Sequence, residues 1–208
     1  AKQNTTSLTG FNISVGITDD FMAALAAGKT FWLQFGGKRY REIDARELWD
    51  KIMRSTWDWA EPGVLFIDRM NEMNNLWYCE KIAATNPCGE QPLPPFGACL
   101  LGSFNLVRYV SKDMHGWRFD WEGLARDIAP VVRAMDNVVD RALYPLQEQR
   151  LEALNKRRMG LGVTGLANAF EAMGLPYGSP EFLEMEGQLL AFIARHCYLA
   201  SVELAKEK

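Results

Sequence analysis

The stretch that decides the fold is Asn86-Pro87-Cys88-Gly89-Glu90-Gln91-Pro92-Leu93-Pro94-Pro95-Phe96-Gly97-Ala98-Cys99. Asn86, Cys88 and Glu90 occupy alternate positions, and alternate residues of an extended backbone point to the same side. The spacing therefore predicts that an amide, a thiol and a carboxylate face one small volume. Proline favours an extended conformation for the residue before it, and glycine permits close backbone approach. Because three more prolines follow, we expect a stiff loop that projects into a cavity.

These three groups suit chemistry on a hydroxyl group. A carboxylate such as Glu90 can take a proton from an alcohol, and the amide of Asn86 can both donate and accept hydrogen bonds. The thiol of Cys88 can serve as a nucleophile, a hydrogen-atom donor or a redox partner. Cys99 follows the proline-rich turn and could return near Cys88, and geometry decides whether the two can bridge. The competing interpretation is that both cysteines are small buried residues and Glu90 is a solvated charge.

Outward from this segment, the patterns predict strands that alternate with helices, which indicates an α/β architecture. Alternating β-branched residues predict a strand over Gly10–Ile17, and a short apolar run predicts another at Val64–Asp68. Helices are expected where a polar cap precedes apolar residues at helical spacing. The expected helix starts are Thr18, Asp44, Asp120 and Ser179.

Composition limits the functions that the chain can have. Its 208 residues carry a formal charge of −3 and are 48% hydrophobic, which indicates an ordered globular protein with no basic surface for nucleic acid. There is no apolar run of the roughly 20 residues that a membrane span needs, and no signal peptide. Four cysteines without a Cys-x-x-Cys pair and only two histidines predict no metal site, and they indicate a reducing, cytoplasmic location.

Both ends of the sequence look internal. The chain begins without Met, and its last helical pattern ends at Lys208 without a Gly or Pro exit. We expect residues 1–208 to be a single partial domain, cut from the middle of a longer protein.

Residues 86–93 and Gly97–Leu106 closely resemble the large catalytic subunit of ribonucleotide reductase. Four further blocks resemble the same family in the same order, so the resemblance covers nearly the whole chain. These blocks are Phe11–Val15, Thr18–Met22, Glu61–Arg69 and Arg157–Leu166.

The resemblance implies that the chain forms part of a ten-stranded α/β barrel with a central finger loop. Cys88 matches the cysteine that becomes a thiyl radical and abstracts the 3′ hydrogen atom of the ribose. Glu90 matches the carboxylate that takes the 3′-hydroxyl proton, and Asn86 matches the amide that binds the substrate. Cys99 matches one of two redox-active thiols. The implied substrate-binding residues are Asn86, Pro87, Cys88, Gly89 and Glu90.

The sequence of residues 89–97 is most similar to that of the adenosylcobalamin-dependent (class II) members that reduce ribonucleoside diphosphates. The implied partners are a ribonucleotide, nucleotide effectors, a thioredoxin-like dithiol reductant and further copies of the full-length chain. The second redox thiol and the effector loops should lie upstream of Ala1, and the phosphate-binding segment and thiol tail downstream of Lys208. We therefore expect no turnover from these 208 residues alone.

Three alternatives remain open. A metal-cofactor (class I) reductase would take its radical from a separate small subunit. Gly160–Gly165 fits the dinucleotide pattern G-x-G-x-x-G and suggests an NAD-dependent dehydrogenase, but a polar helical pattern stands where the motif needs a strand. Seven tryptophans would suit an interaction domain, although scattered tryptophans usually pack in a core.

Cys79 and Cys197 are interpreted as core cysteines, Lys156–Arg158 as a solvated helix end, and His115 as part of a turn.

Overall fold

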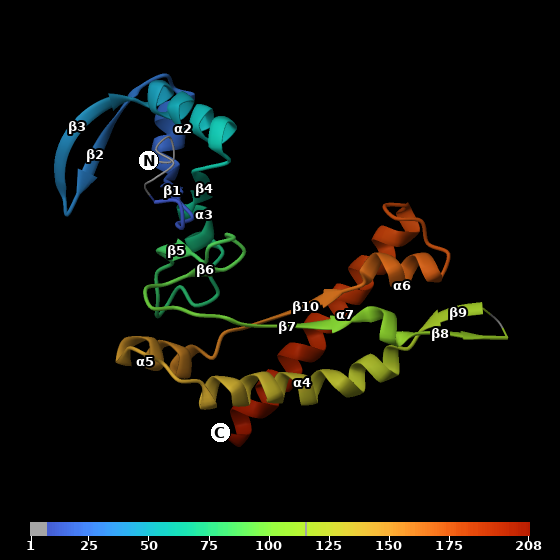
Figure 1. Ribbon diagram of the computed structural model, residues 1–208. Coiled ribbons are helices and arrows are strands. Elements are labelled where there is room, and N and C mark those ends of the chain that lie inside the picture. Colours follow the sequence, from blue (N-terminus) through green and yellow to red (C-terminus); the bar gives the residue numbers. More distant parts are fainter. Residues whose placement is uncertain (1–7, 115) are drawn as a thin grey trace. The chain divides into compact units, whose positions relative to one another are not determined.

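The computed structural model describes residues 8–114 and 116–208, so the interpretations of His115 and of the first seven residues lie outside the described part (Figure 1). The chain divides into two compact units, unit 1 up to Gly97 and unit 2 from Ala98. Unit 1 contains β1 (Ser14–Ile17), α1 (Asp19–Ala26), β2 (Thr30–Phe35), β3 (Lys38–Asp44), α2 (Ala45–Trp59), β4 (Gly63–Phe66), α3 (Ile67–Glu72), β5 (Ala84–Thr85) and β6 (Pro92–Leu93). Unit 2 contains β7 (Leu100–Asn105), the 3₁₀ helix η1 (Leu106–Tyr109), β8 (Val110–Asp113), β9 (Gly116–Phe119), α4 (Trp121–Arg141), α5 (Gln147–Lys156), β10 (Met159–Thr164), α6 (Leu166–Ala172) and α7 (Pro180–Glu207). Strands and helices mix in both units, which confirms the α/β class.

In unit 1, β1 and β4 form a parallel pair in which Ser14 lies opposite Gly63. The connection between them passes through α1, the β2–β3 hairpin and α2. Side-chain caps start both helices as the sequence predicts. The Thr18 hydroxyl accepts a hydrogen bond from the Phe21 N–H at 3.2 Å, and the Asp44 carboxylate accepts one from the Glu47 N–H at 2.8 Å.

The core of unit 1 lies between the β1–β4 pair and the helices α1 and α2. One face of each strand turns toward this core, because Ile17 is buried and Val15 and Val64 pack against the same cluster. The other face of β1 carries Ser14 and Gly16, which are exposed. The remaining buried members of the cluster are Phe21, Leu25, Ala45 and Ile52.

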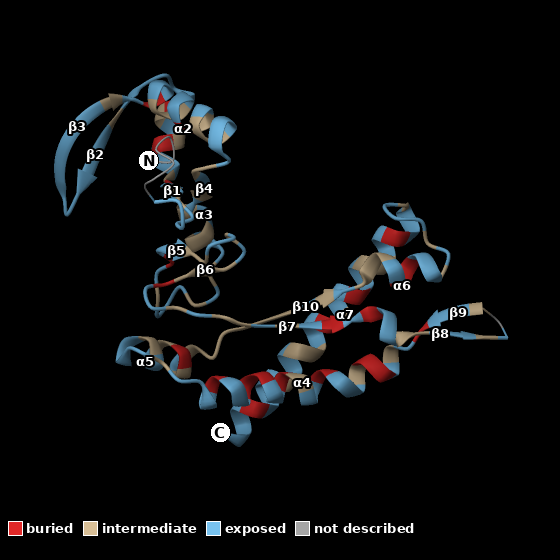
Figure 2. Cartoon of the chain, in the orientation of Figure 1, coloured by how far each residue is buried: buried red, intermediate tan, exposed pale blue. Residues whose placement is uncertain are grey.

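In unit 2, β7 and β10 form a second parallel pair, with Leu100 opposite Met159. Helix α4 packs against α7, and the buried segments of both helices, red in Figure 2, belong to one hydrophobic core. Its fully buried side chains include Leu106, Leu124, Ile128, Phe170 and Leu189. From β7, Phe104 is buried in this core, and a Cβ added at Gly102 would lie 3.1 Å from the sulfur of the buried Met135.

Most of the glycine-rich stretch, Gly160 to Thr164, lies in strand β10, and Gly165 is the left-handed N-cap of α6. The element before it is helix α5. A dinucleotide loop follows a strand and opens a helix, so this stretch lacks the context that the NAD alternative requires.

Most of the tryptophans are not in a core, contrary to expectation. The exposed ones are Trp32, Trp57, Trp59, Trp77 and Trp117. Within the described part of the chain, no helix is both long enough and apolar enough to cross a membrane.

Candidate active site

The segment with the amide, thiol and carboxylate forms a short hairpin, which we call the Cys88 hairpin (residues 84–93). Strands β5 and β6 pair antiparallel, with Thr85 opposite Pro92. Next to this pair, toward the tip of the hairpin, the Asn86 N–H donates a hydrogen bond of 3.2 Å to the carbonyl of Gln91. Each strand has only two residues, so the hairpin depends on contacts at its tip.

The tip is a tight turn and not an extended segment, so the predicted backbone geometry is wrong. The Gly89 N–H donates to the Asn86 carbonyl at 3.0 Å, and the φ angle of Gly89 is +85°. Proline at the second position of a turn and glycine in the left-handed region are both favourable there. The sequence interpretation placed Pro87 and Gly89 between three groups on an extended part of a stiff loop, and it missed this turn chemistry.

The turn nevertheless brings two of the predicted groups together. The Asn86 side-chain amide donates a short hydrogen bond to the Glu90 carboxylate, and its carbonyl oxygen accepts one from the Gln91 N–H at 3.0 Å. Asn86 therefore fixes both the shape of the turn and the position of the carboxylate. Cys88 lies at the tip with an exposed, free thiol, which excludes its interpretation as a small buried residue.

Cys99 belongs to unit 2 and stands immediately before β7. It is half-buried, and its thiol lies 3.7 Å from the Leu100 carbonyl oxygen. Cys79, like Cys88, is an exposed free thiol. Pairing of Cys99 with another thiol stays a prediction.

A cavity of about 430 Å³ adjoins the base of the Cys88 hairpin within unit 1. Its lining combines the exposed row of β1, the ends of β4 and α3, and the hairpin. These residues are Gly10, Phe11, Asn12, Ser14, Gly16, Leu65, Ile67, Ala83, Ala84, Thr85, Asn86 and Pro87. Sequence reasoning missed Asn12 and Ser14, although the alternation of Asn12, Ser14 and Gly16 with apolar residues was a signal for one polar strand face.

Asn71 was also missed, and it fixes the approach to the hairpin. Its side-chain amide donates to the carbonyls of Ile67 and Ile82 at 2.9 and 3.0 Å. Its carbonyl oxygen accepts from the Ile82 N–H at 2.8 Å. The irregular segment before β5 is thereby held to α3, because Asn71 binds both the N–H and the carbonyl of buried Ile82.

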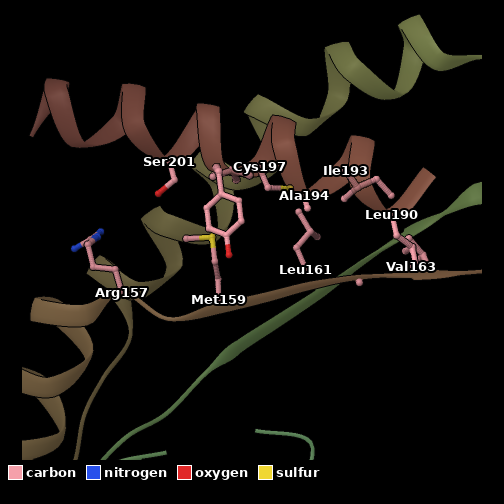
Figure 3. A pocket seen from close by; sticks show the side chains of 12 residues that line it. Arg157, Met159, Leu161, Val163, Leu190, Ile193, Ala194, Cys197 and Ser201 are labelled. Carbon is pink, nitrogen blue, oxygen red and sulfur yellow. The ribbon is translucent and has the colours of Figure 1, made fainter. Parts of the chain in front are cut away.

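Unit 2 holds a different cavity, of about 430 Å³, between α7, β10 and α4. Figure 3 shows mainly apolar side chains there, among them Leu161, Leu190 and Ile193, with Arg157 at one end. Cys197 lines this cavity, and burial raises the pKa of its thiol. That agrees with its interpretation as a core cysteine, whereas Cys79 is exposed and its interpretation is wrong.

The basic run before β10 is not a solvated helix end, contrary to expectation. Arg157 binds Asp136 at 2.5 Å and Asp140 at 2.7 Å, and Lys208 contacts both carboxylates. Hydrogen bonds from Arg157 are the main reason why the pKa values of both carboxyls are lowered, that of Asp140 to about 2. We call these four residues the Arg157 cluster. It ties α4 to the junction between α5 and β10.

The whole chain, residues 1–208, matches the family described as "Ribonucleotide reductase, barrel domain". A vitamin B12-dependent ribonucleoside-diphosphate reductase of Thermoplasma acidophilum is 37% identical over 203 residues, covering 97% of this chain and 26% of that protein. Its counterpart in Mycobacterium tuberculosis is 36% identical over 208 residues, covering 99% and 30%. A ribonucleoside-diphosphate reductase subunit alpha of Chlamydia pneumoniae is 31% identical over 173 residues, covering 81% and 16%.

The chain thus spans less than a third of the length of these curated relatives. The match nevertheless extends over every described element of both units. This chain belongs to the ribonucleotide reductase barrel-domain family.

Proposed function

We propose that the full-length protein reduces ribonucleoside diphosphates to 2′-deoxyribonucleoside diphosphates by thiyl-radical chemistry at Cys88. The observation that carries the proposal is the turn that exposes the Cys88 thiol and joins the Asn86 amide to the Glu90 carboxylate. Family membership supports it, because the relatives that align over nearly the whole chain are named as ribonucleoside-diphosphate reductases. In the proposed architecture, the Cys88 hairpin is the central finger loop of a ten-stranded barrel.

In this proposal each group acts on the ribose. A Cys88 thiyl radical takes the 3′ hydrogen atom and later returns it. Glu90 accepts the 3′-hydroxyl proton, which assists departure of the 2′-hydroxyl as water. Two thiols, one of them Cys99, supply the two electrons and become a disulfide, which an external thioredoxin-like dithiol then reduces. Asn86 holds Glu90 in place, and such fixed geometry matters because hydrogen-atom transfer requires near contact.

Adenosylcobalamin is the proposed radical source, and when bound it supplies the chemistry that removes a hydrogen atom from a thiol. The Cys88 hairpin fits this role, because its sulfur is exposed at the tip of a turn whose shape is fixed by hydrogen bonds. The B12-dependent reductases of Thermoplasma acidophilum and Mycobacterium tuberculosis are 37% and 36% identical to this chain, against 31% for the subunit alpha, and this favours adenosylcobalamin over a metal cofactor in a second subunit.

The proposal is tested with Cys88→Ser in the full-length protein. We expect loss of deoxynucleotide formation with unchanged circular dichroism, whereas unchanged turnover would refute the radical role. Electron paramagnetic resonance of the wild-type protein tests the radical source. Coupled cob(II)alamin and thiyl signals support adenosylcobalamin, and a requirement for a second subunit contradicts it. The proposal also includes a cytoplasmic location, regulation by nucleotide effectors and self-association of the full-length chain.

A further inference from the structure

We propose that the cavity between β1 and the Cys88 hairpin binds the sugar of a nucleoside, and that Asn12 and Ser14 bind its hydroxyl groups. The inference rests on the proposed function and adds a second wall to its site. The first wall is the Cys88 hairpin, which contributes Thr85, Asn86 and Pro87 to the cavity lining. The second is β1, whose polar face has no role in the core of unit 1.

The two faces of β1 have different surroundings. Val15 and Ile17 pack on the core beneath α1 and α2, whereas Ser14 and Gly16 line the cavity together with Asn12, which lies just before the strand. The same division continues on β4, where Val64 joins the core and Leu65 lines the cavity. The polar residues are therefore on the cavity side because the strand alternates, and packing of the core does not require them.

Gly63 leaves space for the Ser14 hydroxyl. The two residues lie opposite each other in the parallel pair, and a Cβ added at Gly63 would come within 2.8 Å of the Ser14 Oγ. Any other residue at position 63 would displace the hydroxyl. The pair thus keeps a hydroxyl donor and acceptor at the edge of the cavity.

The lining selects the neutral part of a nucleotide. It offers the amides of Asn12 and Asn86 and the hydroxyls of Ser14 and Thr85, and none of its described residues is charged. Amide and hydroxyl groups both donate and accept, which matches the neighbouring hydroxyls of a furanose. Leu65 and the other apolar lining residues suit a sugar or base face, and about 430 Å³ lies within the usual range for small-molecule sites.

Asn86 connects this cavity to the reacting groups. Its side chain binds Glu90, and its neighbour Cys88 carries the exposed thiol. A sugar held against Asn86 from the cavity side would therefore lie beside the hairpin that carries the chemistry. Two nucleosides occur in the proposed reaction, the ribose part of the substrate and the adenosyl part of the cofactor, and they share the chemistry that this lining recognises.

The test measures binding in the full-length protein, with Cys88→Ser as the background so that no turnover consumes the ligand. Isothermal titration calorimetry is done with adenosine diphosphate and, separately, with adenosylcobalamin. Asn12→Ala and Ser14→Ala should each lower the affinity for one of these ligands about tenfold, which corresponds to the loss of one hydrogen bond. Weaker adenosine diphosphate binding identifies the substrate ribose as the occupant, and weaker adenosylcobalamin binding identifies the adenosyl group.

Gly16→Ala tests the same cavity in a second way, because the added methyl group only reduces the space available to the ligand. Its methyl group would lie 3.9 Å from the Ile67 Cβ, an ordinary contact, so the fold should be kept while binding weakens. Ser111→Ala is the matched control, since Ser111 is also an exposed strand serine but lies in unit 2. Unchanged affinity for both ligands in all three cavity variants would overturn the proposal.

Failure of this inference is distinguishable from failure of the proposed function. If Cys88→Ser retains turnover, the radical role is lost while the binding results still decide the cavity. If Cys88→Ser abolishes turnover but the cavity variants bind both ligands like Ser111→Ala, the function stands and the cavity role of Asn12 and Ser14 is wrong.

Discussion

Replacing Asp136 by Asn should loosen the start of β10 by a measurable amount. Asp136 is only 4% exposed, and its carboxylate binds the Arg157 guanidinium at 2.5 Å while its own carbonyl accepts a second bond at 3.0 Å. Removing one partner of a buried ion pair costs about 3–5 kcal/mol. Arg157 is 26% exposed and keeps Asp140, and Asn keeps one acceptor, so we expect a smaller loss of about 2 kcal/mol.

Hydrogen exchange read by mass spectrometry on peptides that cover residues 153–164 measures this loss in the full-length protein. A local opening free energy lowered by about 2 kcal/mol corresponds to exchange about 30-fold faster. Asp140→Asn is the matched control on the same helix. It removes a carboxylate that is 40% exposed, so its effect should be smaller. Exchange within about threefold of wild type for Asp136→Asn, or a larger effect for Asp140→Asn, would show that burial of this pair does not hold the junction.

Three further predictions concern the hairpin and acid stability. Gly89→Ala forces an L-residue to φ +85°, at a cost of about 1–2 kcal/mol, and should lower the turnover number without lowering the melting temperature of the whole protein. Asn71→Ala leaves both backbone groups of buried Ile82 without their side-chain partner, at about 1 kcal/mol each, and should speed hydrogen exchange in residues 80–86 more than elsewhere. Because the folded pKa of Asp140 is about 2, below its ordinary 3.8, its contribution to stability is complete above pH 4 and is lost as the pH falls toward 2. An acid titration followed by circular dichroism should therefore show a less steep loss of structure in Asp140→Asn over that window.

The sequence was most informative where a single residue determines local geometry. Thr18, Asp44, Asp120 and Ser179 each cap a helix through the side chain, as predicted. Short polar side chains before an apolar periodic run compensate the free N–H groups of a first turn, and this preference is local. The strand β7 was not predicted individually, because its pairing depends on distant residues. Met159, for example, is the partner of Leu100.

The sequence predicted that Asn86 and Glu90 lie together, which the structure confirms, but it predicted the wrong backbone geometry for the segment between them. The prediction placed Asn86 and Glu90 together because alternate residues of an extended backbone point the same way. In the structure a turn, and not an extended segment, brings them together. Proline at the second turn position and a left-handed glycine were both visible in the sequence, and weighing them together would have indicated the turn. The proximity of Asn12 and Ser14 to the hairpin could not be derived locally, because it depends on how β1 and residues some 70 positions away fold around one cavity.

The prolines of the hairpin have a consequence for self-association. A two-residue ribbon normally leaves unsatisfied amide groups that can recruit another chain into a growing sheet. On the return side, Pro92 pairs with Thr85 yet has no N–H, and Pro94 and Pro95 follow it directly. This edge of the hairpin therefore offers few backbone N–H donors to another polypeptide chain. We therefore expect these prolines to hinder the addition of a further strand to the return side of the hairpin.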